Sequence, residues 1–205
     1  MTDVSTDTSK VGGPTRPSAG PVVQHLVLRV RDIEKSHIFY TEILGFERCA
    51  TLDPARYPWT MYFYRGSVDH HHDLAIAQLD DPESAPPAEL PWQMFGRTPG
   101  IDHIAIRYPG REEWLSQIAW MKSQGVEFLV RGNHGMTHSA YIQDPDGNGI
   151  EVLYDVPMEA WADDVNEALN YFDALPVDSL DDSTDYVKFT AVNSVGTPKT
   201  SSVAS

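Results

Sequence analysis

The sequence has 205 residues, 41% hydrophobic and 10% aromatic, which is enough apolar material for a folded core. Its formal net charge is −15, from 15 Lys and Arg against 30 Asp and Glu, and this balance argues against nucleic acid or an anionic membrane as a partner. Because Cys49 is the one cysteine, an internal disulfide is excluded, and we expect a cytoplasmic protein. No apolar run approaches the roughly 18 residues of a membrane span.

Residues 1–20 are rich in Ser, Thr, Gly and Pro and predict a disordered arm. The first folded elements are a strand over 22–30 and a helix that follows Asp32, a plausible N-cap, and ends at Gly45. Alternating apolar residues then predict three further strands, over 46–52, 60–65 and 74–79. The order of this first unit is therefore β-α-β-β-β.

A Pro-rich connector precedes a second unit with the same order of elements. This unit begins with a strand over 101–107 and a helix over 111–124, whose apolar stripe includes Trp114, Ile118 and Met121. A strand over 126–131 and a hairpin over 139–154 complete it.

The two units match as an internal repeat. His-Ile-Ala-Ile-Arg, which starts at His103, follows His-Leu-Val-Leu-Arg, which starts at His25, after 78 residues. The helix-stop glycines Gly45 and Gly125 are 80 residues apart. The sequence therefore predicts an α+β fold of two paired βαβββ modules. The expected boundaries are an arm over 1–20, module one over 21–80, a connector over 81–100, module two over 101–157, a C-terminal amphipathic helix over 158–175 and a polar tail over 176–205.

The hairpin of module two places a carboxylate in the middle of a strand. Its turn, residues 144–149, combines Asp, Pro, Asn and Gly, and its second strand alternates Ile150, Val152 and Tyr154 on one face with Glu151 on the other. Burying a carboxylate is costly unless it is paired or binds a metal. Glu151 therefore needs a partner, and histidines are available.

These features resemble the vicinal oxygen chelate superfamily, and within it the short single-domain form of the type I extradiol (catechol-cleaving) dioxygenases. The resemblance covers about residues 22–157. It includes a long motif, matched here by Gly132-Asn133-His134, Tyr141, the turn Asp144-Pro145-Asp146-Gly147 and Glu151, with Ala140 where the family has a larger aliphatic residue. The resemblance implies an incomplete β-barrel around one metal site.

The resemblance places His25, His103 and Glu151 on that metal. Two imidazoles and one carboxylate are the facial triad of non-haem Fe(II) oxygenases, so the expected cofactor is Fe(II), with Mn(II) as a possible substitute. Strand parity groups His25 on one face with Val27 and Arg29. The repeat position of Glu151 in module one is Ala75, where glyoxalase-type members have a further acidic ligand.

Three further residues match family positions in the substrate pocket. The resemblance implies that His72 takes up and returns a catechol proton, for which an imidazole is suited. It implies that Tyr141 donates a hydrogen bond to the substrate and that His134 hydrogen-bonds it or relays protons. Alternative readings are a solvated histidine run over 70–72, a loop histidine at 134 and a core tyrosine at 141. Trp92 and Phe95 are candidates to wall the pocket.

We therefore expect an Fe(II)-dependent enzyme that cleaves a catechol-type substrate with O₂, as a homo-oligomer that binds neither nucleic acid nor a membrane. Two alternatives stay open. One is another metal-dependent enzyme of the superfamily, such as a fosfomycin-type thiol transferase, an epimerase or a glyoxalase-like enzyme. The other is a non-enzymatic resistance protein that binds an aromatic ligand in the same cleft.

Overall fold

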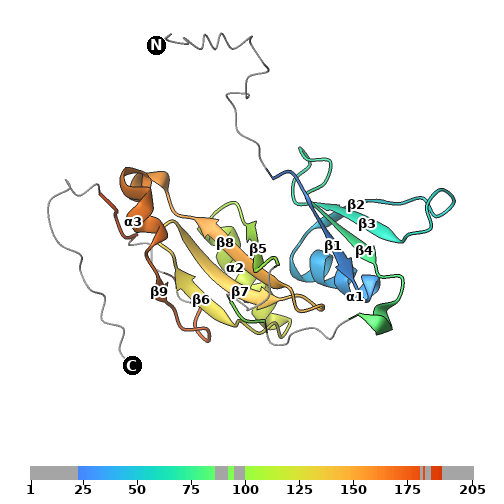
Figure 1. Cartoon of the computed structure of the whole chain (residues 1–205). Helices are drawn as coiled ribbons and strands as arrows, with labels where there is room; N and C mark the ends of the chain where they lie inside the picture. Colours follow the sequence, from blue (N-terminus) through green and yellow to red (C-terminus); the bar gives the residue numbers. More distant parts are fainter. Residues whose placement is uncertain (1–22, 86–91, 95–99, 181, 183–185, 191–205) are drawn as a thin grey trace, which may run out of the picture.

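The computed structural model describes residues 23–85, 92–94, 100–180, 182 and 186–190. Its strands form two hydrogen-bonded sheets, one from each half of the chain, and Figure 1 shows the two modules side by side. The α+β class and the two βαβββ modules are confirmed. The expected arm, over 1–20, lies outside the described residues.

Module one forms a four-stranded sheet in the order β1-β4-β3-β2. Strand β1 is parallel to β4, and the other pairs are antiparallel. The helix begins where predicted, because the Asp32 carboxylate accepts a hydrogen bond from the Lys35 backbone N–H at 3.1 Å. Its elements are β1 (Leu26–Val30), α1 (Ile33–Ile38) continued by a π-helical turn (Phe39–Ile43), β2 (Glu47–Thr51), β3 (Met61–Arg65) and β4 (Leu74–Gln78).

Module two forms a five-stranded sheet in the order β5-β8-β7-β6-β9. Its helix buries Trp114, Ile118 and Met121 against the sheet, as the apolar stripe predicts, and the Trp114 indole N–H donates to the Val152 carbonyl at 2.9 Å. Its elements are β5 (His103–Arg107), α2 (Arg111–Ser123), β6 (Val130–Asn133), β7 (Thr137–Gln143), β8 (Gly149–Asp155) and β9 (Asp173–Ala174).

Three sequence-based predictions differ from the structure. The strand expected over 22–30 is β1, Leu26–Val30, so His25 lies just before the strand rather than in it. The strand expected over 126–131 is β6, Val130–Asn133, because pairing with β7 starts only at Val130 opposite Tyr141. The single C-terminal helix expected over 158–175 is instead two 3₁₀ turns (Met158–Ala160 and Ala162–Asp164), the short α3 (Val165–Leu169) and β9. Asp164 caps α3, and β9 pairs with the edge of β6, so tertiary pairing overrides the helical spacing of the apolar residues.

Described parts of the expected polar tail pack on module two. Leu180 and Tyr186 lie against the hydrophobic core, and Phe189 is buried, with its backbone N–H donating to the Ala160 carbonyl. The C-terminal segment, residues 158–190, therefore belongs to the structure of module two in its described part.

Contacts between the modules come from the turn of the β7–β8 hairpin and from α2. The Tyr40 hydroxyl donates to the Asp144 carboxylate at 2.9 Å, and Arg31 forms an ion pair with Asp146 at 3.0 Å. On the other side, the Trp120 indole N–H of α2 donates to the Glu42 carbonyl at 2.9 Å, and the Tyr108 hydroxyl, between β5 and α2, donates to the Leu44 carbonyl at 2.9 Å. The turn that the sequence marks most strongly thus joins the two modules.

Candidate active site

The acidic half-site, formed by His103, Glu151, Tyr141 and His134, lies on the face of the module-two sheet away from α2. Because β5 is parallel to β8 and β7 is antiparallel to it, Ala105, Glu151 and Tyr141 share one row across three strands. His103 lies two residues before Ala105 on the same face, and its Nε2 is 3.2 Å from the Glu151 carboxylate. The side chain of Glu151 is only 9% exposed, so its charge is held by these neighbours rather than by water.

The orientation of the His103 ring is fixed by a hydrogen bond at Nδ1, the nitrogen that points away from Glu151. Its Nδ1–H donates a hydrogen bond to the Asp102 carboxylate at 2.7 Å, and its Nε2 faces Glu151. A carboxylate behind an imidazole is a common support for a metal-binding histidine, because it sets the tautomer and raises the basicity of the ring. Within this half-site, His103 and Glu151 are therefore the two side chains that could hold a divalent cation.

Tyr141 of β7 and His134, which directly follows β6, complete the acidic half-site. The Tyr141 hydroxyl donates to Glu151 Oε1 at 2.8 Å, and His134 Nε2 lies 3.0 Å from the same hydroxyl. Burial, and next the adjacent Glu151, raise the pKa of Tyr141, so the phenol remains a donor at neutral pH. Burial lowers the pKa of His134, which favours its neutral form. The pair can therefore hold and pass a proton without carrying a net charge.

The histidine half-site, formed by His25, His71 and His72, belongs to module one. The ring centroids of His25 and His72 are 4.5 Å apart, and the Nδ1 atoms of His71 and His72 are 2.6 Å apart. His25 also hydrogen-bonds Gln24 through Nδ1. Burial, and next the neighbouring imidazoles, lower the pKa of His72, so it is neutral and able to accept a proton near pH 7.

The structure therefore brings four of the six predicted site residues together in module two and the other two together in module one. Among the described residues, no group of three or more His, Cys, Asp or Glu side chains is arranged to hold a metal ion. His103 and Glu151 fit two places of the predicted triad, whereas His25 lies with the other half-site.

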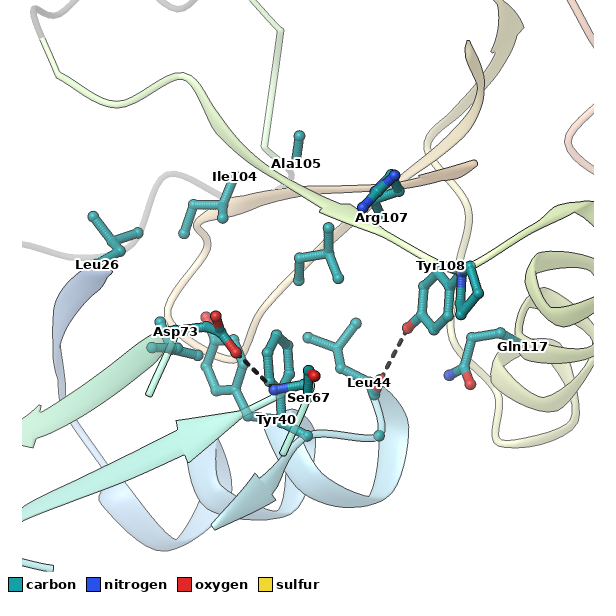
Figure 2. A pocket seen from close by; sticks show the side chains of 16 residues that line it. Leu26, Tyr40, Leu44, Ser67, Asp73, Ile104, Ala105, Arg107, Tyr108 and Gln117 are labelled. Atoms are coloured by element: carbon teal, nitrogen blue, oxygen red, sulfur yellow. Dashed lines mark hydrogen bonds between the residues drawn. The ribbon is translucent and has the colours of Figure 1, made fainter. Parts of the chain in front are cut away.

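A cavity of about 810 Å³ lies where the edge strands β1 and β5 face each other. Figure 2 shows Leu26 of β1 and Ile104 of β5 on its walls, together with the hydrogen bond from Tyr108 to the Leu44 carbonyl. Ala105 and Arg107, on the Glu151 face of β5, also line it. The cavity therefore lies between the two edge strands, and none of the six predicted site residues lines it.

An aromatic row extends from the acidic half-site. It consists of Trp92, Tyr141, His134 and Phe172. The Trp92 ring stacks on Tyr141, with centroids 5.8 Å apart and planes within 9°, and on the far side the ring of Phe172 lies 5.1 Å from that of His134. Trp92 was one of two candidates to wall the pocket, and the other, Phe95, lies outside the described residues.

Asp102 and Phe172 were not among the predicted site residues. The signal for Phe172 was a glycine inside a strand, which often marks the close approach of another group. A Cβ atom on Gly132 would lie 2.3 Å from the Phe172 ring. The signal for Asp102 was its position directly before a candidate histidine ligand.

No helix among the described residues is long and apolar enough to cross a membrane. The family model described as the Glyoxalase/Bleomycin resistance protein/Dioxygenase superfamily matches residues 22–152. The chain is 30% identical to a catechol-2,3-dioxygenase of Bacillus subtilis over 137 residues, which are 67% of this chain and 42% of that enzyme. The chain thus matches less than half the length of that relative.

A second relative has a different activity. The chain is 28% identical to a lactoylglutathione lyase of Pseudomonas putida over 153 residues, a match that takes in 67% of this chain and 87% of the lyase. Among solved structures, a glyoxylase/bleomycin resistance protein/dioxygenase domain from Frankia sp. EAN1pec superposes with a TM-score of 0.53 at 16% identity, covering 67% of this chain and all of that one. That likeness supports the fold alone.

Proposed function

Since the chain belongs to the Glyoxalase/Bleomycin resistance protein/Dioxygenase superfamily, we propose that it is an Fe(II)-dependent extradiol dioxygenase that opens the aromatic ring of a catechol-type substrate with O₂. The observation that carries this proposal is the environment of Glu151. Its carboxylate contacts both the His103 imidazole and the Tyr141 hydroxyl, while its counterpart in module one is Ala75. A triad of His25, His103 and Glu151 without a fourth acidic ligand leaves positions for a diol and O₂.

A bound Fe(II), or Mn(II) in its place, would supply those coordination positions and stabilise negative charge on the oxygen atoms of the substrate. In the proposal, His72 removes a proton from one catechol hydroxyl, because its Nδ1 faces His71 and its Nε2 is left to act as base. Tyr141 donates its Oη hydrogen to a substrate oxygen. His134, hydrogen-bonded to that Oη, keeps the hydroxyl oriented and takes part in proton return.

This proposal requires His25 to approach His103 and Glu151, either within one chain or from a second copy in the expected homo-oligomer. Mixing two inactive variants separates these cases. His25→Ala and Glu151→Ala carry their defects in different half-sites, so a site shared between copies regains activity in the mixture. If each chain completes its own site, the mixture remains inactive.

The proposed activity is tested by loading the protein with Fe(II) without O₂ and then adding O₂ with a series of catechols. We expect yellow ring-opened product and consumption of one O₂ for each ring opened. A protein that holds Fe(II) but consumes no O₂ with any catechol would contradict the proposal. A protein that binds catechols but holds no metal would indicate the non-enzymatic ligand-binding alternative.

A glyoxalase-like lyase is the second candidate, because the match to the Pseudomonas putida lyase covers most of that enzyme. Ala75 separates the two functions. Glyoxalase-type members were expected to have an acidic ligand at this position, and a methyl group cannot bind a metal. Isomerisation of a glutathione hemithioacetal by the metal-loaded protein, measured without O₂, would favour the lyase over the dioxygenase.

A further inference from the structure

Phe172 belongs to the C-terminal segment, which lies beyond the residues matched by the family model, 22–152. Figure 1 shows α3 and β9 at the end of module two away from module one. The chain between α3 and β9 nevertheless returns to the sheet face that carries the acidic half-site. Gly132 identifies this face, because it pairs with Ser139 of β7. Ser139 lies two residues before Tyr141 and therefore points to the same face of the sheet.

The Phe172 ring lies over Gly132 at a distance that leaves no room for a side chain there. A Cβ atom on Gly132 would be 2.3 Å, 3.0 Å and 3.1 Å from three carbon atoms of the ring. The ring also packs beside His134, with centroids 5.1 Å apart. Phe172 still remains 52% exposed, so part of a large apolar side chain is open to solvent beside the proposed site.

The position of this ring is held on both sides. Two residues after it, Ala174 of β9 pairs with Gly132 on the edge of β6. Four residues before it, the Ala168 carbonyl oxygen lies 3.3 Å from where a Cβ atom on Gly135 would be, and the φ of +74° at Gly135 turns the chain just after His134. The backbone around Phe172 is therefore fixed by the same strand and turn that carry the aromatic row.

From this arrangement we infer that Phe172 is a specificity-determining residue, and that the substrate is a catechol bearing an apolar substituent, aromatic or alkyl, on its ring. The inference rests on the proposed function, because it orients the substrate with its hydroxyls at Glu151 and His103. From there the row continues through Tyr141 and His134 to Phe172. A substituent pointing along the row reaches the open part of the Phe172 ring, whereas unsubstituted catechol leaves it in contact with water.

The test compares catechol with phenyl-substituted catechols in wild-type protein, Phe172→Ala and Phe172→Leu. We expect Phe172→Ala to lower kcat/KM for the phenyl-substituted substrates by about tenfold or more, to leave catechol nearly unchanged, and Phe172→Leu to fall between. Gly132→Ala provides an independent variant, because its Cβ displaces the ring without removing it. It should reproduce the loss seen in Phe172→Ala.

Leu169→Ala is the matched control, since Leu169 lies on α3 in the same segment and is 70% exposed. It should leave the preference between the two substrates unchanged. Equal losses for catechol and its phenyl derivatives, or no loss at all in Phe172→Ala, would overturn the inference. Melting curves of each variant identify a loss that comes from unfolding.

Binding is also measured without O₂, by quenching of tryptophan fluorescence with and without Fe(II), so that one readout does not depend on turnover. We expect wild-type protein to bind phenyl-substituted catechol more tightly than catechol, and Phe172→Ala to lose this difference. If wild-type protein cleaves no catechol but shows this Phe172-dependent binding, the dioxygenase proposal fails and the assignment of Phe172 stands. Equal affinity of wild-type protein for both ligands would reject the role of Phe172.

Discussion

Modules one and two repeat the same strand register but place different side chains in it. In module one, Ala75 of β4 lies opposite Val27 and Phe63. In module two, the equivalent row has Glu151 of β8 opposite Ala105 and Tyr141. The carboxylate and the phenol of the acidic half-site therefore replace a methyl group and a plain aromatic ring.

This comparison separates what the fold supplies from what the individual side chains supply. Ala75 and Glu151 are both buried in the centres of their sheets. The duplicated unit therefore provides two equivalent positions, each on the face of its own sheet that points away from the helix of that module. Only module two uses its position for a polar group, and it surrounds that group with donors. Module one contributes histidines from its rim, at 25 and 72. The proposed site is thus asymmetric although its scaffold is repeated.

The largest expected effect comes from removing the polar group that distinguishes the modules. Glu151→Ala should abolish tight Fe(II) binding and all ring-cleaving activity, because it removes one of three ligands and leaves His103 without its partner. The measurement is iron content after dialysis, together with O₂ consumption. Asp155→Asn, at the exposed end of the same strand, should retain both. A full complement of iron in Glu151→Ala would remove this residue from the metal site.

Introducing a carboxylate into module one, at the position equivalent to Glu151, should also stop the reaction, but the protein should keep its metal. Ala75→Glu should add a fourth protein ligand, keep or raise the affinity for Fe(II), and abolish oxygenase activity by filling a position that the diol or O₂ requires.

Ala77→Glu is the control for Ala75→Glu, because Ala77 points to the same face one pleat further along β4. It should not change the affinity for the metal. If Ala75→Glu lowers the melting temperature strongly without a gain in Fe(II) affinity, the side chain is buried away from the metal and the comparison fails.

A smaller effect is expected from the base contributed by module one. His72→Phe should keep Fe(II) and slow turnover by roughly 10²–10⁴-fold, because it removes proton transfer but no ligand. His70→Phe, a change in the same histidine run at a ring paired with Asp73, should leave kcat unchanged. Loss of iron from His72→Phe would instead show that His72 binds the metal.

The smallest effect on activity is expected where the C-terminal segment attaches to module two, which has no counterpart in module one. The side chain of Asp182 is fully buried and accepts hydrogen bonds from Arg111 and Tyr154, at 2.9 Å and 2.8 Å, and from His138. Asp182→Ala should leave kcat for catechol within about twofold and lower stability by roughly 3 kcal/mol, or about 10 °C in melting temperature. Asp178→Ala, an exposed change in the same segment, should have little effect.

The stabilisation by Asp182 should depend on pH. Burial alone would raise the pKa of Asp182, but the hydrogen bonds from His138 and Tyr154 outweigh it, so the pKa in the folded state lies below the ordinary value of 3.8. The contribution is therefore complete above pH 3.8 and is lost as the pH falls through the lower, folded-state value. Denaturation of wild-type protein and Asp182→Ala between pH 2 and 7 should show their difference shrinking only below about pH 4. A constant difference would contradict this assignment.

Most of the fold could be predicted from the sequence because its signals are local. Alternating apolar residues, the Asp32 cap and the helix-stop glycines each act within a few residues of themselves. The start of β6 and the path after Pro157 could not be predicted in the same way. Each depends on which distant strand is available for pairing, and the apolar residues of the C-terminal segment suit either a helix or a tertiary contact.

The candidate site likewise has a part that depends on adjacent strands and a part that depends on contacts between distant segments. His103, Glu151 and Tyr141 meet because the register between adjacent strands of one module fixes their spacing, as the family resemblance implies. Whether His25 reaches them depends on the junction between β1 and β5, where the cavity lies. Phe172 depends on the folding back of the C-terminal segment. Neither relation leaves a periodic signal in the sequence.

The central claim is that both modules supply ligands to one metal, and X-ray absorption of the Fe(II)-loaded protein tests it most directly. The number of imidazole ligands is measured in wild-type protein, His25→Ala and His103→Ala. We predict two imidazoles in the wild-type protein and, because each variant lacks one of the three ligands, loss of tightly bound iron from His25→Ala and His103→Ala. A wild-type site with one imidazole, unchanged in His25→Ala, would contradict the claim.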